Sequence, residues 1–238
     1  MSVINHNLQA VHASIAAAAR AVSRDPHAIR LLAVSKTFGP DAVLEAARAG
    51  QTAFGENYLQ EALDKMATLH AAQPDLRLEW HFIGPIQSNK TRPIAEHFDW
   101  VHSVDREKIA QRLSEQRPAH LPPLNICLQI NISGEASKSG ASLEQASALA
   151  HAIAALPHLT LRGLMAIPEP ADTLEQQRVP YRQLHQLFDQ LCAQGLALDT
   201  LSIGMSADMA AAIAEGATMV RVGTAIFGKR DYAKNHGK

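Results

Sequence analysis

The chain has few cysteines and few aromatic side chains, and its charges nearly balance. Only two cysteines, Cys127 and Cys192, occur in 238 residues, one in an apolar run and the other in an amphipathic segment. This placement predicts two buried free thiols rather than a disulfide. The 22 basic and 23 acidic residues give a formal net charge of −1. No polybasic surface therefore favours nucleic acid or an anionic membrane as a partner.

Long hydrophobic runs and metal-binding motifs are also missing. No apolar stretch approaches the roughly 20 residues that span a bilayer. Residues 1–22 are amphipathic and lack the basic start and apolar core of a signal peptide, so the sequence predicts a cytoplasmic protein. The 12 histidines show no metal-ligand spacing. His97 and His102 are separated by a predicted helix–strand boundary, which argues against a shared metal.

Short β-type runs alternate with helical stretches along the chain. Hydrophobic residues make up 47% of it, which is enough for a substantial core. The predicted strands cover residues 29–36, 52–56, 78–84, 100–105, 124–133, 159–167, 198–204 and 219–223. The predicted helices cover residues 40–50, 57–72, 88–98, 106–116, 142–156, 174–195 and 206–217, after one N-terminal helix. Pro180 is expected to end or kink the first part of the longest helix.

This alternation argues for parallel strands joined by helical crossovers. Eight such strands fit a single α/β domain over residues 1–238, a closed (β/α)8 barrel of the TIM type with an extra N-terminal helix and no C-terminal β-domain. A doubly wound open sheet is the alternative. In a barrel, the functional site is expected at the C-terminal ends of the strands.

Lys36 ends the apolar run 31–36, whereas the other 7 lysines stand in polar or small-residue surroundings. Because side chains alternate along a strand, Leu32, Val34 and Lys36 share one face. If that face is the barrel interior, partial desolvation favours the uncharged amine, which is a nucleophile for aldehydes. The alternatives are that Lys36 reaches solvent or pairs with Glu56.

Two loops near the end of the sequence have the composition of a phosphate site. Ser206 is a candidate N-cap of the helix 206–217, and helix N-termini bind anions. Gly223 and Thr224 follow the last predicted strand, where many barrels of this type bind phosphate. Barrel closure brings these loops beside Lys36, so they are suited to a phosphorylated aldehyde such as pyridoxal phosphate.

Two further cationic residues need partners. Arg221 precedes Gly223 by two positions in an apolar strand, so both are expected to face inward. A pyridine nitrogen or a ligand carboxylate would serve Arg221, and pairing with a core acid is the alternative. Lys138 lies in the polar loop 133–140, which has the composition of an anion-binding nest. A plain polar loop is the alternative there.

Seven runs of sequence, in order over residues 31–232, resemble the signature runs of the pyridoxal phosphate homeostasis protein family. They are "LLAVSKT", "FGENYLQEA", "WHFIGPIQSNK", "INISGEASKSG", "LRGLMAI", "SIGMSADM" and "VRVGTAIFGKRDY". That family is similar to the barrel domain of alanine racemases and ornithine decarboxylases. The resemblance implies a barrel that binds pyridoxal 5′-phosphate without a well-established catalytic activity.

The resemblance also implies which residues bind the cofactor. Lys36 would bond to the aldehyde, and Arg221 would face the pyridine nitrogen. The phosphate would be held by the loops around positions 206 and 223, and the remaining residues would shape or line the site. The implied set is Lys36, Asn57, His81, Ile83, Ser202, Gly204, Met205, Ser206, Arg221, Gly223 and Thr224.

Two functions are compatible with such a site. One is a carrier that holds the cofactor for vitamin B6 homeostasis and supplies apo-enzymes transiently; the other is a racemase-like enzyme acting on amino acids. The racemases resembled here use a tyrosine from a further β-domain as a second base. Only 15 residues follow Gly223, and neither Tyr181 nor Tyr232 has an evident place opposite Lys36. The sequence therefore favours a monomeric carrier, with the enzyme as the alternative.

Overall fold

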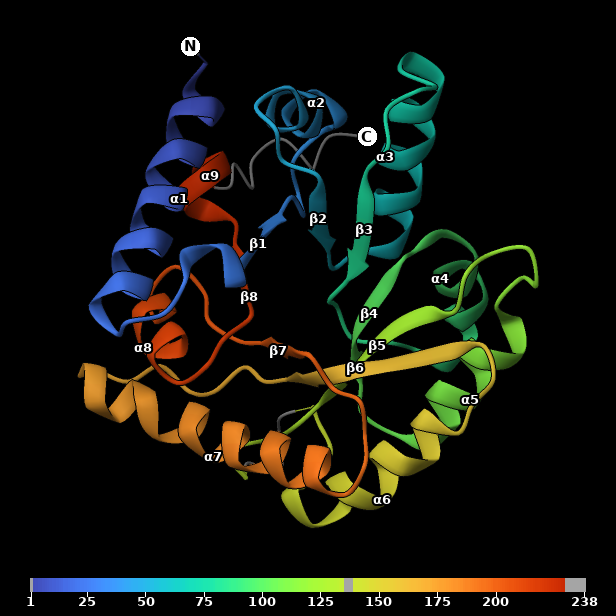
Figure 1. Ribbon diagram of the computed structural model, residues 1–238. Coiled ribbons are helices and arrows are strands. Elements are labelled where there is room, and N and C mark those ends of the chain that lie inside the picture. The colour runs from blue at the N-terminus through green and yellow to red at the C-terminus, as the bar shows by residue number, and fades with distance from the viewer. Residues whose placement is uncertain (1, 135–138, 230–238) are drawn as a thin grey trace.

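The structure, a computed structural model, describes residues 2–134 and 139–229. Eight parallel strands form one closed barrel in chain order (Figure 1). The strands are β1 Arg30–Val34, β2 Ala53–Glu56, β3 Glu79–Phe82, β4 Trp100–Val104, β5 Leu124–Gln129, β6 Leu159–Met165, β7 Thr200–Ser202 and β8 Met219–Val222. β8 pairs with β1, and Leu32 lies opposite Arg221. The predicted barrel is therefore confirmed, and the open sheet is excluded.

Helices surround the barrel. They are α1 Val3–Ala21, α2 Pro40–Arg48, α3 Leu59–Ala72, α4 Thr91–His97, α5 Glu107–Gln116, α6 Leu143–Ala154, α7 Leu174–Ala193, α8 Met209–Ala214 and α9 Thr224–Phe227, with the 3₁₀ turns η1 Pro26–Ala28 and η2 Ser88–Lys90. The extra helix α1 packs beside α2, α8 and α9 (Figure 1). Over the described part of the chain, no helix combines the length and apolarity needed to cross a membrane.

α7 shows how local signals compete. It starts with a capping box, in which Thr173 and Gln176 satisfy each other's backbone N–H groups. The helix then continues through Pro180 to Ala193, so Pro180 does not end it. Tyr181, Leu184, Leu187 and Leu191 are buried along one face of α7. This apolar face outweighs the backbone hydrogen bond that proline cannot donate.

The strands are buried on both faces, as expected for a parallel barrel. Leu31 and Ala33 of β1 belong to the large core between strands and helices, whereas Leu32 packs in a separate cluster with Ala53 and Met219. Leu32 therefore faces the barrel interior, as the predicted alternation requires.

Both cysteines are free thiols, as predicted. Cys127 lies in the barrel interior beside Trp100 and Met165. Its burial raises the pKa of the thiol to about 12. Cys192 is only half-buried, so the predicted burial holds for one of the two.

Candidate functional site

A cavity of about 290 Å³ opens at the C-terminal ends of β1 and β8. It is lined by Val34, Lys36, Asn57, Ile83, Ile167, Met205, Ser206, Ala207, Arg221, Gly223 and Thr224. Eight of these were predicted from the sequence, and the structure brings them together. Val34, Ile167 and Ala207 were not predicted, because apolar side chains carry no chemical signal that separates a cavity wall from ordinary core.

Lys36 is half-buried at the cavity, immediately after the end of β1. The residues on either side of it are held by the charged side chains of Lys65 and Glu61. On one side, the carbonyl of Ser35 accepts a hydrogen bond of 2.9 Å from Lys65 Nζ. On the other, the N–H of Thr37 donates to Glu61 Oε1 at 2.6 Å. Thr37 has φ +70°, a conformation that β-branched residues rarely adopt, so these contacts hold a strained turn.

Lys65 is the more deeply buried of the two lysines, with 3% of its surface exposed. Its ammonium lies 2.6 Å from Glu56 Oε1 and 3.2 Å from Glu61 Oε1. The partners of Lys65 are polar, as its sequence neighbours suggest, but its burial was not predicted. The sequence left open a pairing of Glu56 with Lys36. In the structure, Glu56 forms its ion pair with Lys65. Burial raises the pKa of Glu56, and the charge and hydrogen bond of Lys65 oppose that rise.

A signal for Lys65 was present in the sequence. Ala62, Lys65 and Leu69 are the buried residues of α3, and they recur at helical spacing on one face. A lysine on the apolar face of a helix needs a buried partner, and Glu56 ends the strand just before α3.

Two features of the cavity wall fit a polar ligand. The side-chain oxygen of Asn57 is buried and, within the described residues, has no hydrogen-bond partner. Arg221 is 4% exposed, and its guanidinium bonds to neutral oxygens: the Ser202 carbonyl and Oγ and the Ala166 carbonyl. A buried cation held by neutral acceptors and a buried unsatisfied oxygen are both costly, and a ligand that meets them would offset that cost.

The ends of β1 and β8 approach each other closely at Gly223. A Cβ at this position would lie 2.9 Å from the carbonyl oxygen of Val34. Only glycine allows the start of α9 to stand this close to the end of β1, the strand that Lys36 follows. Asn7 of α1 donates to the carbonyl of Ile226 at 2.9 Å and so ties α9 to the N-terminal helix.

Ser206 lines the cavity but does not cap a helix, so that part of the prediction is wrong. α8 begins at Met209, and Ser206 is exposed in the turn before it. Asp208 holds this turn: its Oδ1 accepts the N–H of Met205 at 2.6 Å, and its Oδ2 accepts the hydroxyl of Tyr181 at 2.6 Å. Asp208 satisfies the turn and the core tyrosine together, and this delays the helix.

Three residues of the predicted set do not line the cavity. His81 and Ser202 are fully buried in the barrel interior. Gly204 is buried at φ +91°, where a side chain would also collide with Ala212. Gly204 therefore shapes the loop after β7 from beneath. His81 and Ser202 belong to a polar chain described below. The predicted loop residue Lys138 lies outside the described residues.

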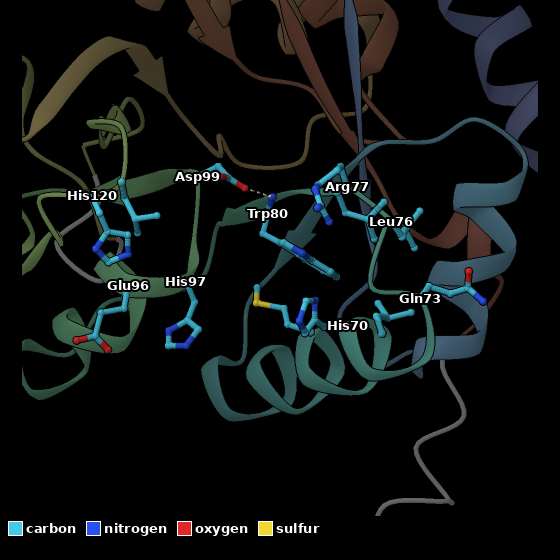
Figure 2. A pocket seen from close by; sticks show the side chains of 13 residues that line it. His70, Gln73, Leu76, Arg77, Trp80, Glu96, His97, Asp99 and His120 are labelled. Carbon is cyan, nitrogen blue, oxygen red and sulfur yellow. Dashed lines mark hydrogen bonds between the residues drawn. The ribbon is translucent and has the colours of Figure 1, made fainter.

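Two other cavities help to define the site. One of about 520 Å³ shares Asn57, Ile83, Ile167 and Met205 with the Lys36 cavity and extends it toward β5 and β6. The other, of about 820 Å³, lies between α3 and α4 at the opposite end of the barrel (Figure 2). Figure 2 shows Trp80 in its wall, and the backbone N–H of Trp80 donates to Asp99 Oδ2 at 2.8 Å. None of the predicted site residues lines this larger cavity.

The two histidines considered for a metal lie in different environments. The Nδ1 of His97, on α4, bonds to the Pro93 carbonyl, whereas His102 is enclosed in the barrel interior. Across residues 2–134 and 139–229, no cluster of three histidine, cysteine or acidic side chains is arranged to hold a metal ion.

Comparisons with known proteins agree with this geometry. The family model described as "Alanine racemase, N-terminal domain" matches residues 6–231. A pyridoxal phosphate homeostasis protein of Pseudomonas aeruginosa is 63% identical over 232 residues, covering 98% of each chain. Its namesake in Escherichia coli K12 is 56% identical and covers 98% of this chain and 100% of its own.

Solved structures point the same way. PipY of Synechococcus elongatus PCC7942, described with PLP bound, is similar at TM-score 0.81 and 36% identity, covering 94% of this chain and 100% of PipY. An alanine racemase from Clostridium difficile 630 has TM-score 0.69 at 16% identity and shares the fold. The family match and the closed barrel therefore place the chain in the class of proteins with an alanine racemase N-terminal domain. Within that class, the chain belongs to the pyridoxal phosphate homeostasis protein family.

Proposed function

We propose that this chain binds pyridoxal 5′-phosphate beside Lys36 and acts in homeostasis of that cofactor as a carrier. The observation that supports this most strongly is one cavity that joins Lys36 to Arg221, Gly223 and Thr224. The names of the relatives and the PLP-bound structure of PipY support the same ligand.

Each polar residue of the cavity has a role in this proposal. When bound, the cofactor would supply an electrophilic aldehyde carbon, and the amine of Lys36 would bond to it. Gly223, Thr224 and Ser206 would hold the phosphate with backbone N–H groups and hydroxyls. Arg221 would donate to the ring nitrogen, because a guanidinium has donors only. The unsatisfied oxygen of Asn57 would accept a hydrogen bond from the ligand.

The cavity composition favours a carrier over a racemase-like enzyme. Among the lining residues of the described chain, Lys36 is the one side chain suited to take a proton as a base. Tyr58 is exposed, and the hydroxyl of Tyr181 is engaged by Asp208 in the core. Racemisation needs a second acid–base group on the opposite face of the bound amino acid. Tyr232 lies outside the described residues.

We extend the proposal to the protein's setting. Residues 1–238 would form one domain that works in the cytoplasm as a monomer and meets apo-enzymes transiently to hand over the cofactor. Size-exclusion chromatography with light scattering tests the monomer. Cofactor transfer to an apo-enzyme across a dialysis membrane, compared with direct mixing, tests whether contact is needed.

Spectroscopy and peptide mapping test the proposed binding site. Purified protein with pyridoxal 5′-phosphate should show an absorbance band that borohydride reduction shifts, and mass mapping should place the pyridoxyl group on Lys36. Lys36→Ala should abolish the covalent adduct while the phosphate loops retain some ligand. The buried Lys65 is the internal control and should stay unmodified. A label found mainly on another lysine would refute the assignment.

A second experiment separates carrier from enzyme. Loaded protein is incubated with a panel of amino acids in deuterated water, and the α-carbon is followed by NMR. A carrier should exchange α-protons slowly and without scrambling stereochemistry. Multiple turnovers per second with racemisation would establish the enzyme instead.

A further inference from the structure

A chain of polar side chains runs through the barrel interior from its N-terminal end to the cavity. Arg221 Nη1 donates to Ser202 Oγ at 2.9 Å, and Ser202 Oγ lies 2.8 Å from His102 Nδ1. His102 Nε2 lies 2.9 Å from His81 Nδ1, and His81 Nε2 lies 2.5 Å from Glu79 Oε1. Four strands contribute to this chain. It is continuous from a residue at the start of β3 to the cavity wall.

The chemistry of the two ends gives the chain one direction. Arg221 can only donate and an ionised Glu79 can only accept. Ionised Glu79 needs a proton on His81 Nε2, so neutral His81 accepts at Nδ1 from His102 Nε2, and neutral His102 in turn accepts at Nδ1 from the hydroxyl of Ser202. Every hydrogen bond therefore points from Arg221 toward Glu79.

Burial keeps the middle of the chain neutral. His81 and His102 have no exposed surface, and desolvation lowers the pKa of both imidazoles. For Glu79, burial acts to raise the pKa, but His81 and Arg30 outweigh it and hold the pKa at about 2. Arg30 lies 2.8 Å from the same carboxylate. Full charges thus stand at the ends of the chain, with neutral groups between them.

We propose that Glu79 is a remote positioning residue for the ligand site, acting through His81, His102 and Ser202 on Arg221. The chain keeps Ser202 Oγ as an acceptor toward Arg221, and the carbonyls of Ser202 and Ala166 fix the rest of the guanidinium. Arg221 is thereby aimed at an acceptor with a free lone pair, such as an unprotonated ring nitrogen. This inference rests on the proposed function, since the ligand is the one proposed there.

The hydrogen-bond direction can be tested without ligand. Nitrogen NMR of ¹⁵N-histidine-labelled protein should show His81 and His102 as neutral imidazoles protonated on Nε2. Glu79→Gln should broaden or shift both signals, because a glutamine amide can donate as well as accept. The matched control is Glu96→Gln, an acid on α4 that is not part of the chain. An Nδ1–H tautomer at either histidine in the wild type would overturn the proposed direction.

A pair of ligands tests whether the chain acts on the site. Affinities are measured for pyridoxal 5′-phosphate and for its analogue with a ring CH in place of the nitrogen. Ser202→Ala should weaken the first about tenfold, as for loss of a hydrogen bond to a charged group, and the second less than about twofold. Glu79→Gln should also weaken binding of pyridoxal 5′-phosphate, by about threefold, and should affect the analogue less. Glu96→Gln should change neither affinity.

The outcomes separate this inference from the proposed function. If wild-type protein binds neither ligand, the proposed function fails, while the NMR result still tests the chain. If Ser202→Ala lowers the affinity for both ligands equally, the chain is only structural and the inference is wrong. Glu79→Gln, which alters a partly exposed side chain, provides the same comparison should Ser202→Ala fold poorly. Equal affinity ratios in Glu79→Gln and wild type would exclude a role for Glu79.

Discussion

Two polar networks support the cavity, and they are built in opposite ways. Beneath Lys36, the charges of Lys65, Glu56 and Glu61 meet directly, within 2.6 to 3.2 Å. Beneath Arg221, neutral side chains separate the charge of Arg221 from that of Glu79. The first network is an ionic cluster and the second is a hydrogen-bond chain.

The difference follows from what each network must hold. The ionic cluster holds backbone: it bonds to the Ser35 carbonyl and the Thr37 N–H, and so fixes the turn that carries Lys36. The ammonium of Lys65 is shared by the carboxylates of Glu56 and Glu61. The neutral chain holds a side chain, Arg221, whose hydrogen bonds within the described part of the chain go to neutral oxygens. A carboxylate there would compete with the ligand for the guanidinium.

The largest effect should come from breaking the ionic cluster. Lys65→Met leaves Glu56 buried without its cation, and truncating one member of a buried pair costs about 3–5 kcal/mol. The free energy of unfolding, measured in urea without ligand, should fall by that amount. Reaction of Lys36 with pyridoxal 5′-phosphate should also slow, because the turn at Thr37 loses its support.

A double variant is the matched control. Glu56→Leu combined with Lys65→Met removes both charges, and replacing a buried pair with apolar groups is often neutral. The double variant should recover most of the lost stability. If Lys65→Met alone is as stable as wild type, the cluster contributes nothing and the comparison with the neutral chain fails.

The cavity was predicted from the sequence, but the ionic cluster and the hydrogen-bond chain around it were not. Lys36, Arg221, Gly223 and Thr224 were identified because strand ends in a barrel converge, and that follows from alternation along the chain. The contact of His81 with His102 depends on the register of β3 against β4, which pairs His81 with Trp100. Register across neighbouring parallel strands has no local signature, so this chain was not predictable.

Lowering the pH should disturb the neutral chain before the ionic cluster. Unfolded imidazoles gain a proton near pH 6.5, whereas burial lowers the pKa of His81 and His102 in the fold. The stability contributed by keeping these two histidines neutral is therefore fully present above about pH 6.5, and it is lost as the pH falls below that value. With both histidines neutral in the folded protein, the free energy of unfolding falls by about 2 kcal/mol between pH 6.5 and 5.5.

The pH effect is measured by urea unfolding across that range. Glu79 stays ionised throughout it, because its pKa is about 2. His102→Gln removes one titrating group and should remove about half of the slope attributed to the chain, even if the variant is less stable overall. A slope equal to that of wild type would mean that His102 does not titrate on unfolding as proposed.

A smaller effect is expected at the ends of β1 and β8, where Gly223 approaches Val34. Gly223→Ala places a methyl 2.9 Å from the Val34 carbonyl, so the two strand ends must separate. Overpacking of this kind should cost about 1–2 kcal/mol of stability and weaken binding of pyridoxal 5′-phosphate more than of pyridoxal. Gly39→Ala is the control, since no atom lies within 4 Å of its added Cβ. Similar losses in both variants would exclude a specific role for the close approach.

The smallest effect should come from Ser206, which contacts neither network. Its hydroxyl lines the cavity from an exposed turn, so Ser206→Ala should weaken binding of pyridoxal 5′-phosphate by about 1 kcal/mol, as for one partly solvated hydrogen bond. The stability of the ligand-free protein should not change, because Ser206 does not cap α8. Asp208→Ala should lower that stability, since it frees the N–H of Met205 and the buried hydroxyl of Tyr181. Titration with ligand and urea unfolding of both variants give the answer. A loss of about 1 kcal/mol of ligand-free stability in Ser206→Ala would restore the N-cap role that the sequence suggested.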